Sequence, residues 1–330
     1  MKFYFSLLLT CCITTGLKAQ QDSQFTQYIF NGLHINPAYA GTKGDLYVQS
    51  FYRAQWQGIK GAPRTFSIAA DDAFKEGKVG LGMIIANDQI GAQSNLSAFA
   101  NYAYHLNLND NESSTLSFGL AAGMMQLGID GSLLQAINPE DVSIPYTSQT
   151  QVFPDARLGV YFSNDNYYAG FSATNILAKY MSNSRDGEIL IPIPQPHFYL
   201  TAGALFTLNE DVRFKPSFLL KDDVRGPLSL DLNAFFLLKE RVWLGGFYRS
   251  SFNIHNQNLQ KDLPLNNSIG LMTEIFATPD IRIGYSYDYS INKLQSYNSG
   301  SHEISVGFYI NKKEYRKDYR RNRETRCYDF

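Results

Sequence analysis

The sequence predicts an all-β protein: a transmembrane antiparallel outer-membrane β-barrel of about 14 strands. Three observations predict this fold. Apolar residues recur at every second position, connections alternate between short and long, and no segment is apolar enough for a membrane-spanning helix. Tyr and Phe are abundant and charge is scarce. This composition suits a barrel whose apolar lipid face and polar interior average to a mildly polar chain.

The first element is an export signal over residues 1–19. Lys2 gives the positive start, an apolar run begins at Phe3, and Ala19 ends a small-residue exit. The run is too short to span a membrane as a helix. Lipidation of Cys11 is the alternative, which the preceding Thr10 and the very short leader disfavour. Cleavage after Ala19 leaves only Cys327, so we expect no internal disulfide.

The barrel itself is expected over residues 45–310, because apolar side chains alternate with small or polar ones almost throughout. Alternate side chains of a strand point to opposite faces, so each run has one apolar face. Most runs are about ten residues long, the length that a tilted strand needs to cross a bilayer. The expected strands are 45–53, 64–73, 78–87, 94–107, 114–126, 155–163, 166–175, 197–208, 212–221, 228–237, 241–250, 267–276, 280–290 and 301–310.

The connections support the same fold. Even-numbered connections are mostly tight, as at 74–77 and 164–165, whereas odd-numbered ones such as 127–154 and 176–196 are mostly longer. Short periplasmic turns that alternate with longer external loops are typical of outer-membrane barrels. The last strand, 302–310, also has the Ser-x-Gly and aromatic pattern of a barrel-assembly signal.

Two segments flank the barrel, and an even strand number places both termini in the periplasm. Residues 20–44 are expected to form an N-terminal periplasmic segment or a plug. Residues 311–330 are expected to form a basic periplasmic tail, which is a solvated extension, a site for anionic lipids, or a docking site for a periplasmic partner. Tyrosines between its charges favour binding. The candidate partner contacts are Arg316, Arg320, Arg321 and Arg323.

The sequence offers no catalytic, cofactor-binding or metal-binding motif. It has no nucleophile elbow, no phosphate-binding glycine loop and no metal-spaced cluster, and its five histidines are scattered. Adjacent acids at 71–72 and 222–223 are interpreted as solvated rim residues rather than calcium ligands. A barrel hydrolase stays a minor alternative, since strands can bring Ser and His together without a local motif. A net charge near zero gives no sign of a nucleic-acid binder.

Two stretches near the N-terminus carry a family resemblance. Residues 25–41, FTQYIFNGLHINPAYAG, and residues 52–65, YRAQWQGIKGAPRT, resemble the opening of the PorP/SprF family, and the likeness spans essentially the whole mature chain. Gly32 stands where the family often has proline. The residues that carry the pattern are Asn31, Asn36, Pro37, Ala38, Tyr39 and Gly41 in the first stretch and Arg53, Trp56, Gly58, Gly61 and Pro63 in the second.

The resemblance implies an outer-membrane component of the type IX secretion and gliding system of Bacteroidetes. It implies a secreted adhesin, or the C-terminal domain of one, as a partner held at the cell surface. It also implies periplasmic machinery that includes a peptidoglycan-binding component.

The two motifs also have a physical interpretation of their own. Asn36-Pro37 fixes an extended residue before a proline, and Gly41 and Gly44 permit a turn into the first strand. The first motif could therefore form a plug or a latch against the barrel floor. Trp56, at the outer end of the first strand, could belong to the aromatic girdle at the lipid interface.

Two functions remain open on the sequence. The first is a non-enzymatic surface partner of a secreted protein, with the apolar residues Ile189, Ile191 and Ile193 of an external loop as candidate contacts. The second is a passive channel or a transporter of hydrophobic compounds. Whether the lumen is open decides between them.

Overall fold

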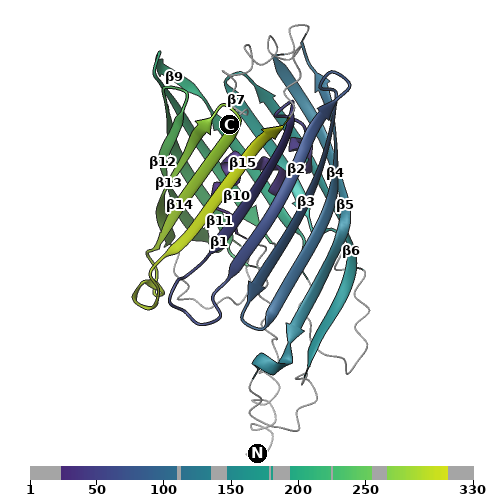
Figure 1. Ribbon diagram of the computed structural model, residues 1–330, viewed down its shortest axis with the longest axis vertical. Coiled ribbons are helices and arrows are strands. Elements are labelled where there is room, and N and C mark those ends of the chain that lie inside the picture. Colours follow the sequence, from purple (N-terminus) through teal and green to yellow (C-terminus); the bar gives the residue numbers. More distant parts are fainter. Residues whose placement is uncertain are drawn as a thin grey trace, which may run out of the picture.

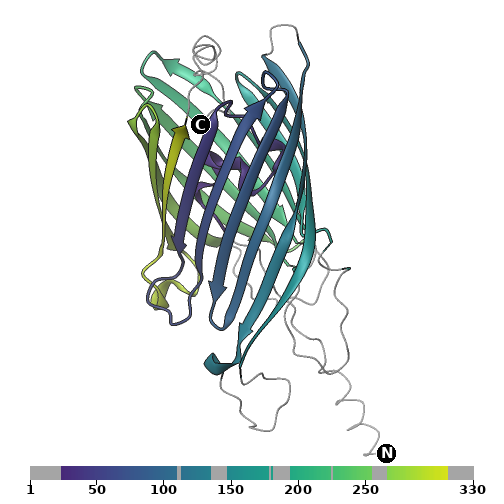
Figure 2. The same ribbon diagram turned by 45° about the vertical axis from the view of Figure 1, so that its right-hand side comes forward.

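The computed structural model describes residues 24–109, 113–134, 147–177, 180, 194–223, 226–254 and 266–310. Within this part of the chain, strands form one closed antiparallel barrel (Figures 1 and 2). The strands are β1 Leu46–Ala54, β2 Arg64–Phe74, β3 Val79–Ile90, β4 Gln93–Asn107, β5 Ser114–Asp130, β6 Ser148–Asn164, β7 Tyr167–Thr174, β8 His197–Ala204, β9 Phe206–Asn209, β10 Val212–Asp222, β11 Leu228–Leu238, β12 Val242–Phe252, β13 Asn266–Thr278, β14 Ile281–Ser290 and β15 Ser301–Ile310.

The barrel closes where its first and last strands pair. β1 and β15 are antiparallel neighbours from Leu46 opposite Ile310 to Ala54 opposite His302. Every other neighbouring pair is also antiparallel and follows chain order, apart from the short β9, which pairs with β10 beside β8. β8 and β9 together cross the barrel wall once, so the described strands make the fourteen crossings that the alternation predicts.

Two strand predictions needed correction. The expected strand 197–208 is interrupted at Leu205, whose side chain is buried and whose N–H donates to Asn166 O at 2.7 Å. The expected long loop 127–154 is shorter, because β5 and β6 stay paired as far as Asp130 opposite Ser148. Polar residues on this outer part of the hairpin hide the continuing pairing from the sequence pattern. The hairpin projects beyond the other strands at the lower end of Figure 1.

The two ends of the barrel differ. We call the end where β1 finishes at Ala54 and β15 begins at Ser301 the long-loop end, because most of the longer connections meet there. The opposite end, where β1 begins and β15 finishes at Ile310, is the short-turn end. The β3–β4 turn, residues 91–92, is a short connection at the long-loop end, and Gly91 adopts the positive φ of 55° that this tight turn requires.

The wall is apolar outside and polar inside. On β2, Phe66 and Ile68 are exposed on the outer face, whereas Thr65, Ser67 and Asp71 are buried on the inner face. The other strands repeat this arrangement, with exposed Leu, Ile, Phe and Tyr side chains between buried polar ones. A surface of this kind matches a lipid environment rather than water. Among the described residues no helix is long and apolar enough to cross a membrane.

The chain before β1 lies inside the barrel. Residues 24–44, here called the plug, contain three short 3-10 helices, η1 Gln27–Phe30, η2 Gly32–His34 and η3 Pro37–Tyr39. Almost all plug side chains from Thr26 to Lys43 are buried. The purple coil between the strands in Figures 1 and 2 is this segment. The plug therefore forms an apolar core together with buried side chains of the barrel wall.

Candidate functional site

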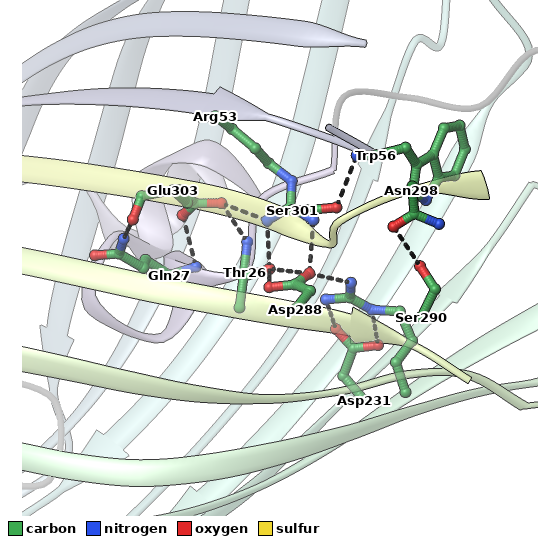
Figure 3. Close-up of polar contacts among 11 residues, drawn as sticks. Thr26, Gln27, Arg53, Trp56, Asp231, Asp288, Ser290, Asn298, Ser301 and Glu303 are labelled. Atoms are coloured by element: carbon green, nitrogen blue, oxygen red, sulfur yellow. Dashed lines mark hydrogen bonds and ion pairs between the residues drawn. The ribbon is translucent and has the colours of Figure 1, made fainter. Parts of the chain in front are cut away.

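A buried charge network surrounds the outer end of the plug, close to the long-loop end of the lumen. Arg53 on β1 pairs with Asp288 on β14 at 2.7 Å and with Glu303 on β15 at 3.0 Å. Arg249 on β12 binds Asp231 on β11 through two bonds of 2.8 Å and approaches Asp288 at 3.3 Å. Figure 3 shows Arg53, Asp231, Asp288 and Glu303, which come from four strands, converging on one region of the lumen.

The plug backbone completes this network. The N–H groups of Thr26 and Gln27 each donate to one oxygen of Glu303, both at 2.8 Å. The Thr26 hydroxyl donates to Asp288 at 2.9 Å and accepts from Arg53 at 2.7 Å (Figure 3). Both acids are therefore shared between the arginines of the wall and the plug, and loss of the plug would leave these buried carboxylates with fewer hydrogen bonds.

The middle of the plug is held by close backbone packing. Asn36 caps η3 by accepting from Ala38 N at 2.9 Å, and its Nδ2 donates to Val160 O on β6 at 3.0 Å. A Cβ added at Gly119 on β5 would lie 2.0 Å from Ala38 N, and one at Gly159 on β6 would lie 2.0 Å from Asn36 Oδ1. Glycine in these two strands is therefore explained by the approach of the Asn-Pro-Ala turn.

The inner end of the plug is fixed near the short-turn end. Gly41, with φ of 76°, donates its N–H to Asp71 on β2 at 2.8 Å, and a Cβ there would lie 2.6 Å from the Cα of Gly80 on β3. His105 on β4 donates from Nε2 to Ala40 O at 2.9 Å. Gly41 is thus required both for its left-handed backbone and for its contact with β3.

Aromatic side chains fill the space between the plug and the wall. Phe30 packs edge-on against Phe235, with ring centres 5.9 Å apart, and tilts against Trp243 at 6.2 Å. Tyr39 packs edge-on against Tyr161 at 5.5 Å. Each of these rings is buried, so the plug is part of the hydrophobic core.

The second motif forms a folded loop over residues 55–63 rather than part of the plug. Trp56 N donates to Ser301 Oγ at 3.1 Å, and Gln57 N donates to Gly300 O at 2.8 Å, which ties the loop to the start of β15. Gly58 and Gly61 take positive φ values of 101° and 76°. Pro63 O accepts from Gln55 N at 2.9 Å and closes the loop.

On the long-loop side of the charge network, the lumen opens into a cavity of about 270 Å³, here called the vestibule. Trp56 borders this cavity with the backbone at φ of 44°, so the expectation that it belongs to the lipid-facing girdle is wrong. The vestibule is lined by Gln24, Arg53, Gln55, Trp56, His197, Lys221, Asp223, Pro227, Ser229, Arg249, Ser251, Asn267, Ser268, Asp288, Ser290, Asn292 and Ser301. Its walls are rich in hydroxyl and amide groups.

The structure brings together most of the residues that sequence analysis singled out. Asn31 contacts Gln49 and His34 inside the barrel, and Pro37, Ala38 and Tyr39 form η3. Sequence reasoning missed Asp231, Arg249, Asp288 and Glu303, the partners of the outer network. The only local signal for each of them is a charge at an inward-facing position of a strand whose other residues are mostly apolar, aromatic or small.

Two predicted sets lie outside the described residues. They are the apolar loop residues Ile189, Ile191 and Ile193 and the basic tail residues Arg316, Arg320, Arg321 and Arg323. The expected signal peptide and Cys327 also lie outside the described residues. Within the part of the chain that the structure describes, no three His, Cys, Asp or Glu side chains gather as a metal site would require.

Fold and site together define a plugged outer-membrane β-barrel. One similar solved structure is a FadL homologue from Pseudomonas aeruginosa, with 9% identity, coverage of 90% of this chain and 96% of that chain, and a TM-score of 0.47. Another is the toluene transporter TbuX from Ralstonia pickettii, with 9% identity, coverage of 86% of this chain and 94% of that chain, and a TM-score of 0.48. The Acinetobacter baumannii outer membrane protein Omp33 is also similar, with 9% identity, coverage of 81% of this chain and 98% of that chain, and a TM-score of 0.45. No curated protein matches the sequence.

The family model for the type IX secretion system membrane protein PorP/SprF matches residues 17–308. The chain therefore belongs to the PorP/SprF family, and it is an outer-membrane component of type IX secretion. The resemblance seen in the two N-terminal motifs is confirmed.

Proposed function

We propose that this barrel is a non-enzymatic scaffold that retains a secreted adhesin, or its C-terminal domain, at the cell surface and couples to the periplasmic secretion and gliding machinery. One observation carries the proposal: the lumen holds a plug that is fixed at both ends, by Glu303 and Asp288 at one end and by Asp71 at the other. A barrel built around a fixed internal segment is suited to holding partners at its two faces.

The same observation counts against the passive channel or hydrophobic-compound transporter. A solute that crosses the lumen would have to displace Phe30, Leu33, Ala38 and Tyr39, all of which are nearly inaccessible to solvent. Displacement would also remove the hydrogen bonds that Thr26 and Gln27 make to the buried carboxylates of Glu303 and Asp288. Planar-bilayer recordings test this directly. The scaffold predicts no steady conductance, and a large steady conductance would favour the channel.

Loop length assigns the two faces. Because long connections face the cell exterior in bacterial barrels, the long-loop end is the surface that meets the secreted partner. It carries the projecting β5–β6 hairpin and the connection that contains Ile189, Ile191 and Ile193, which remain the proposed contacts. The short-turn end, where β15 finishes, is the face for periplasmic partners such as a peptidoglycan-binding component, with Arg316, Arg320, Arg321 and Arg323 as proposed contacts.

The proposal is tested by purifying the tagged barrel from its native outer membrane and identifying bound proteins by mass spectrometry. Recovery of a large secreted adhesin together with periplasmic peptidoglycan-binding proteins supports it. A barrel recovered alone, in detergents that keep other outer-membrane complexes intact, contradicts it.

A deletion then locates the contact. Removal of residues 181–193 should lower surface retention of the secreted partner at least tenfold while the barrel still assembles. Removal of 255–265, another connection at the long-loop end, is the matched control and should leave retention unchanged. Equal retention in both variants would exclude the apolar loop as the contact.

A further inference from the structure

The path of the plug fixes which end of the barrel the preceding chain must leave from. Thr26 and Gln27 contact Glu303, the third residue of β15, and Asp288, near the finish of β14. Both positions belong to the long-loop end. The plug therefore starts beside the vestibule and not at the barrel floor.

From there the chain runs in one direction through the lumen. Tyr28 accepts from Asn233 at 2.6 Å, and Phe30 packs on Phe235, further along β11. Ala40 and Gly41 then meet His105 and Asp71, which lie near the finish of β4 and β2 at the short-turn end. Contact positions thus move steadily from the long-loop end to the short-turn end.

The plug cannot be reversed without losing the contacts that define it. Its outer end needs the carboxylate of Glu303 for two backbone N–H groups, and its middle needs glycine at positions 119 and 159. Gly41 needs the glycine at position 80. These requirements occur at three depths of the wall, so they specify direction as well as position.

We propose that the outer end of the plug, at Gln24, is displayed at the cell surface within the vestibule. The plug adds one crossing to the fourteen of the barrel wall, and an odd total of fifteen places the two ends of the described chain on opposite sides. This changes the expectation that both termini are periplasmic. It leaves the C-terminal end in the periplasm.

The vestibule provides the exit for this terminus. Gln24 is half-buried and lines the same cavity as Arg53, Arg249 and Trp56. A terminus beside the external loops extends the surface offered to the secreted partner. That use rests on the proposed function, whereas the exposure rests only on the assignment of the long-loop end to the cell exterior.

Cysteine labelling of intact cells tests the exposure. In a full-length Cys327→Ser background, Asp22→Cys would be treated with a membrane-impermeant maleimide before and after permeabilisation of the outer membrane. Lys60→Cys, in the exposed β1–β2 loop, reports the long-loop end, and Glu76→Cys, in the exposed β2–β3 turn, reports the short-turn end. Gel shift of the folded barrel confirms assembly of each variant.

We expect Asp22→Cys and Lys60→Cys to label on intact cells and Glu76→Cys to label at least tenfold less until permeabilisation. If Asp22→Cys labels only with Glu76→Cys, or in neither state, the terminus is not displayed. If Glu76→Cys alone labels on intact cells, the barrel orientation is reversed. Either result overturns the proposal, and neither depends on whether a secreted partner is retained.

Discussion

The outer and middle parts of the plug are held by different physics. At the outer end, charge holds the chain, because Thr26 and Gln27 bind acids that also pair with Arg53. In the middle, close contact holds it, because the Asn-Pro-Ala turn lies on Gly119 and Gly159. Charge pairs are costly to bury and lose most when one partner is removed, whereas backbone packing fails when volume is added.

This difference suggests two roles. The ion pairs of the network join wall strands to one another, and the plug adds the hydrogen bonds of Thr26 and Gln27 to two of their acids. The glycine contacts instead define the depth at which η3 rests on β5 and β6. The first kind of contact secures the plug, and the second positions it.

The largest expected effect comes from breaking the charged end. Arg53→Ala leaves Asp288 and Glu303 buried without their main cation, which should cost about 3–5 kcal/mol of unfolding free energy. Urea titration of the purified barrel, followed by the gel shift of the folded form, measures it. Transient openings should also appear in bilayer recordings.

The control is an ion pair with one exposed partner. Arg213 binds Glu240 at 2.6 Å, but the Glu240 side chain is 56% exposed, so Arg213→Ala should cost less than about 1 kcal/mol. Equal costs for the two arginines would mean that the outer network does not hold the plug.

The next effect comes from adding volume to the middle. Gly119→Ala places a methyl group 2.0 Å from Ala38 N, so the plug must shift or the strands must part. This change should lower the free energy of unfolding by about 3 kcal/mol. The same urea titration measures the loss. Gly246→Ala is the control, since its Cβ meets nothing closer than 3.2 Å. A neutral Gly119→Ala would show that η3 does not rest on β5.

These two regions were not equally predictable from sequence. Period-two alternation was enough for the fourteen crossings, because lipid-facing and lumen-facing side chains must alternate. It failed at Leu205, and it failed along the outer β5–β6 hairpin, where most of the exposed positions are polar. Asn36, Pro37 and Gly41 were found through the family resemblance, since their spacing alone suggests only a turn.

The charge network was not predictable, apart from Arg53. Arg53 and Glu303 are 250 positions apart, and they meet only because β1 closes against β15. An inward charge on one strand carries no information on which other charge it faces. Barrel closure and register are therefore needed before the site can be recognised.

A smaller effect is expected where the plug turns toward β6. Asn36→Ala removes the cap of η3 and the bond to Val160 O, and should cost about 1–2 kcal/mol. Asn209→Ala removes a similar bond to Asp211 N in an exposed turn, and it should lower the free energy of unfolding by roughly a few tenths of a kcal/mol. Thermal loss of the folded gel form ranks the two. A reversed order would make the Asn-Pro-Ala turn incidental to stability.

The smallest effect tests whether the segment between the two regions adds its own anchor. Tyr28→Phe deletes the hydroxyl that accepts from Asn233 at 2.6 Å, leaves a buried amide with one bond fewer, and should cost about 1 kcal/mol. Tyr287→Phe, whose hydroxyl bonds Ser299 O at an exposed site, should be near neutral. Combined with Arg53→Ala in a double-mutant cycle, Tyr28→Phe should show coupling if the charged end must be seated before η1 packs. Strict additivity would instead mean that η1 is anchored independently of the network, and the plug would then be held at each depth by separate local contacts.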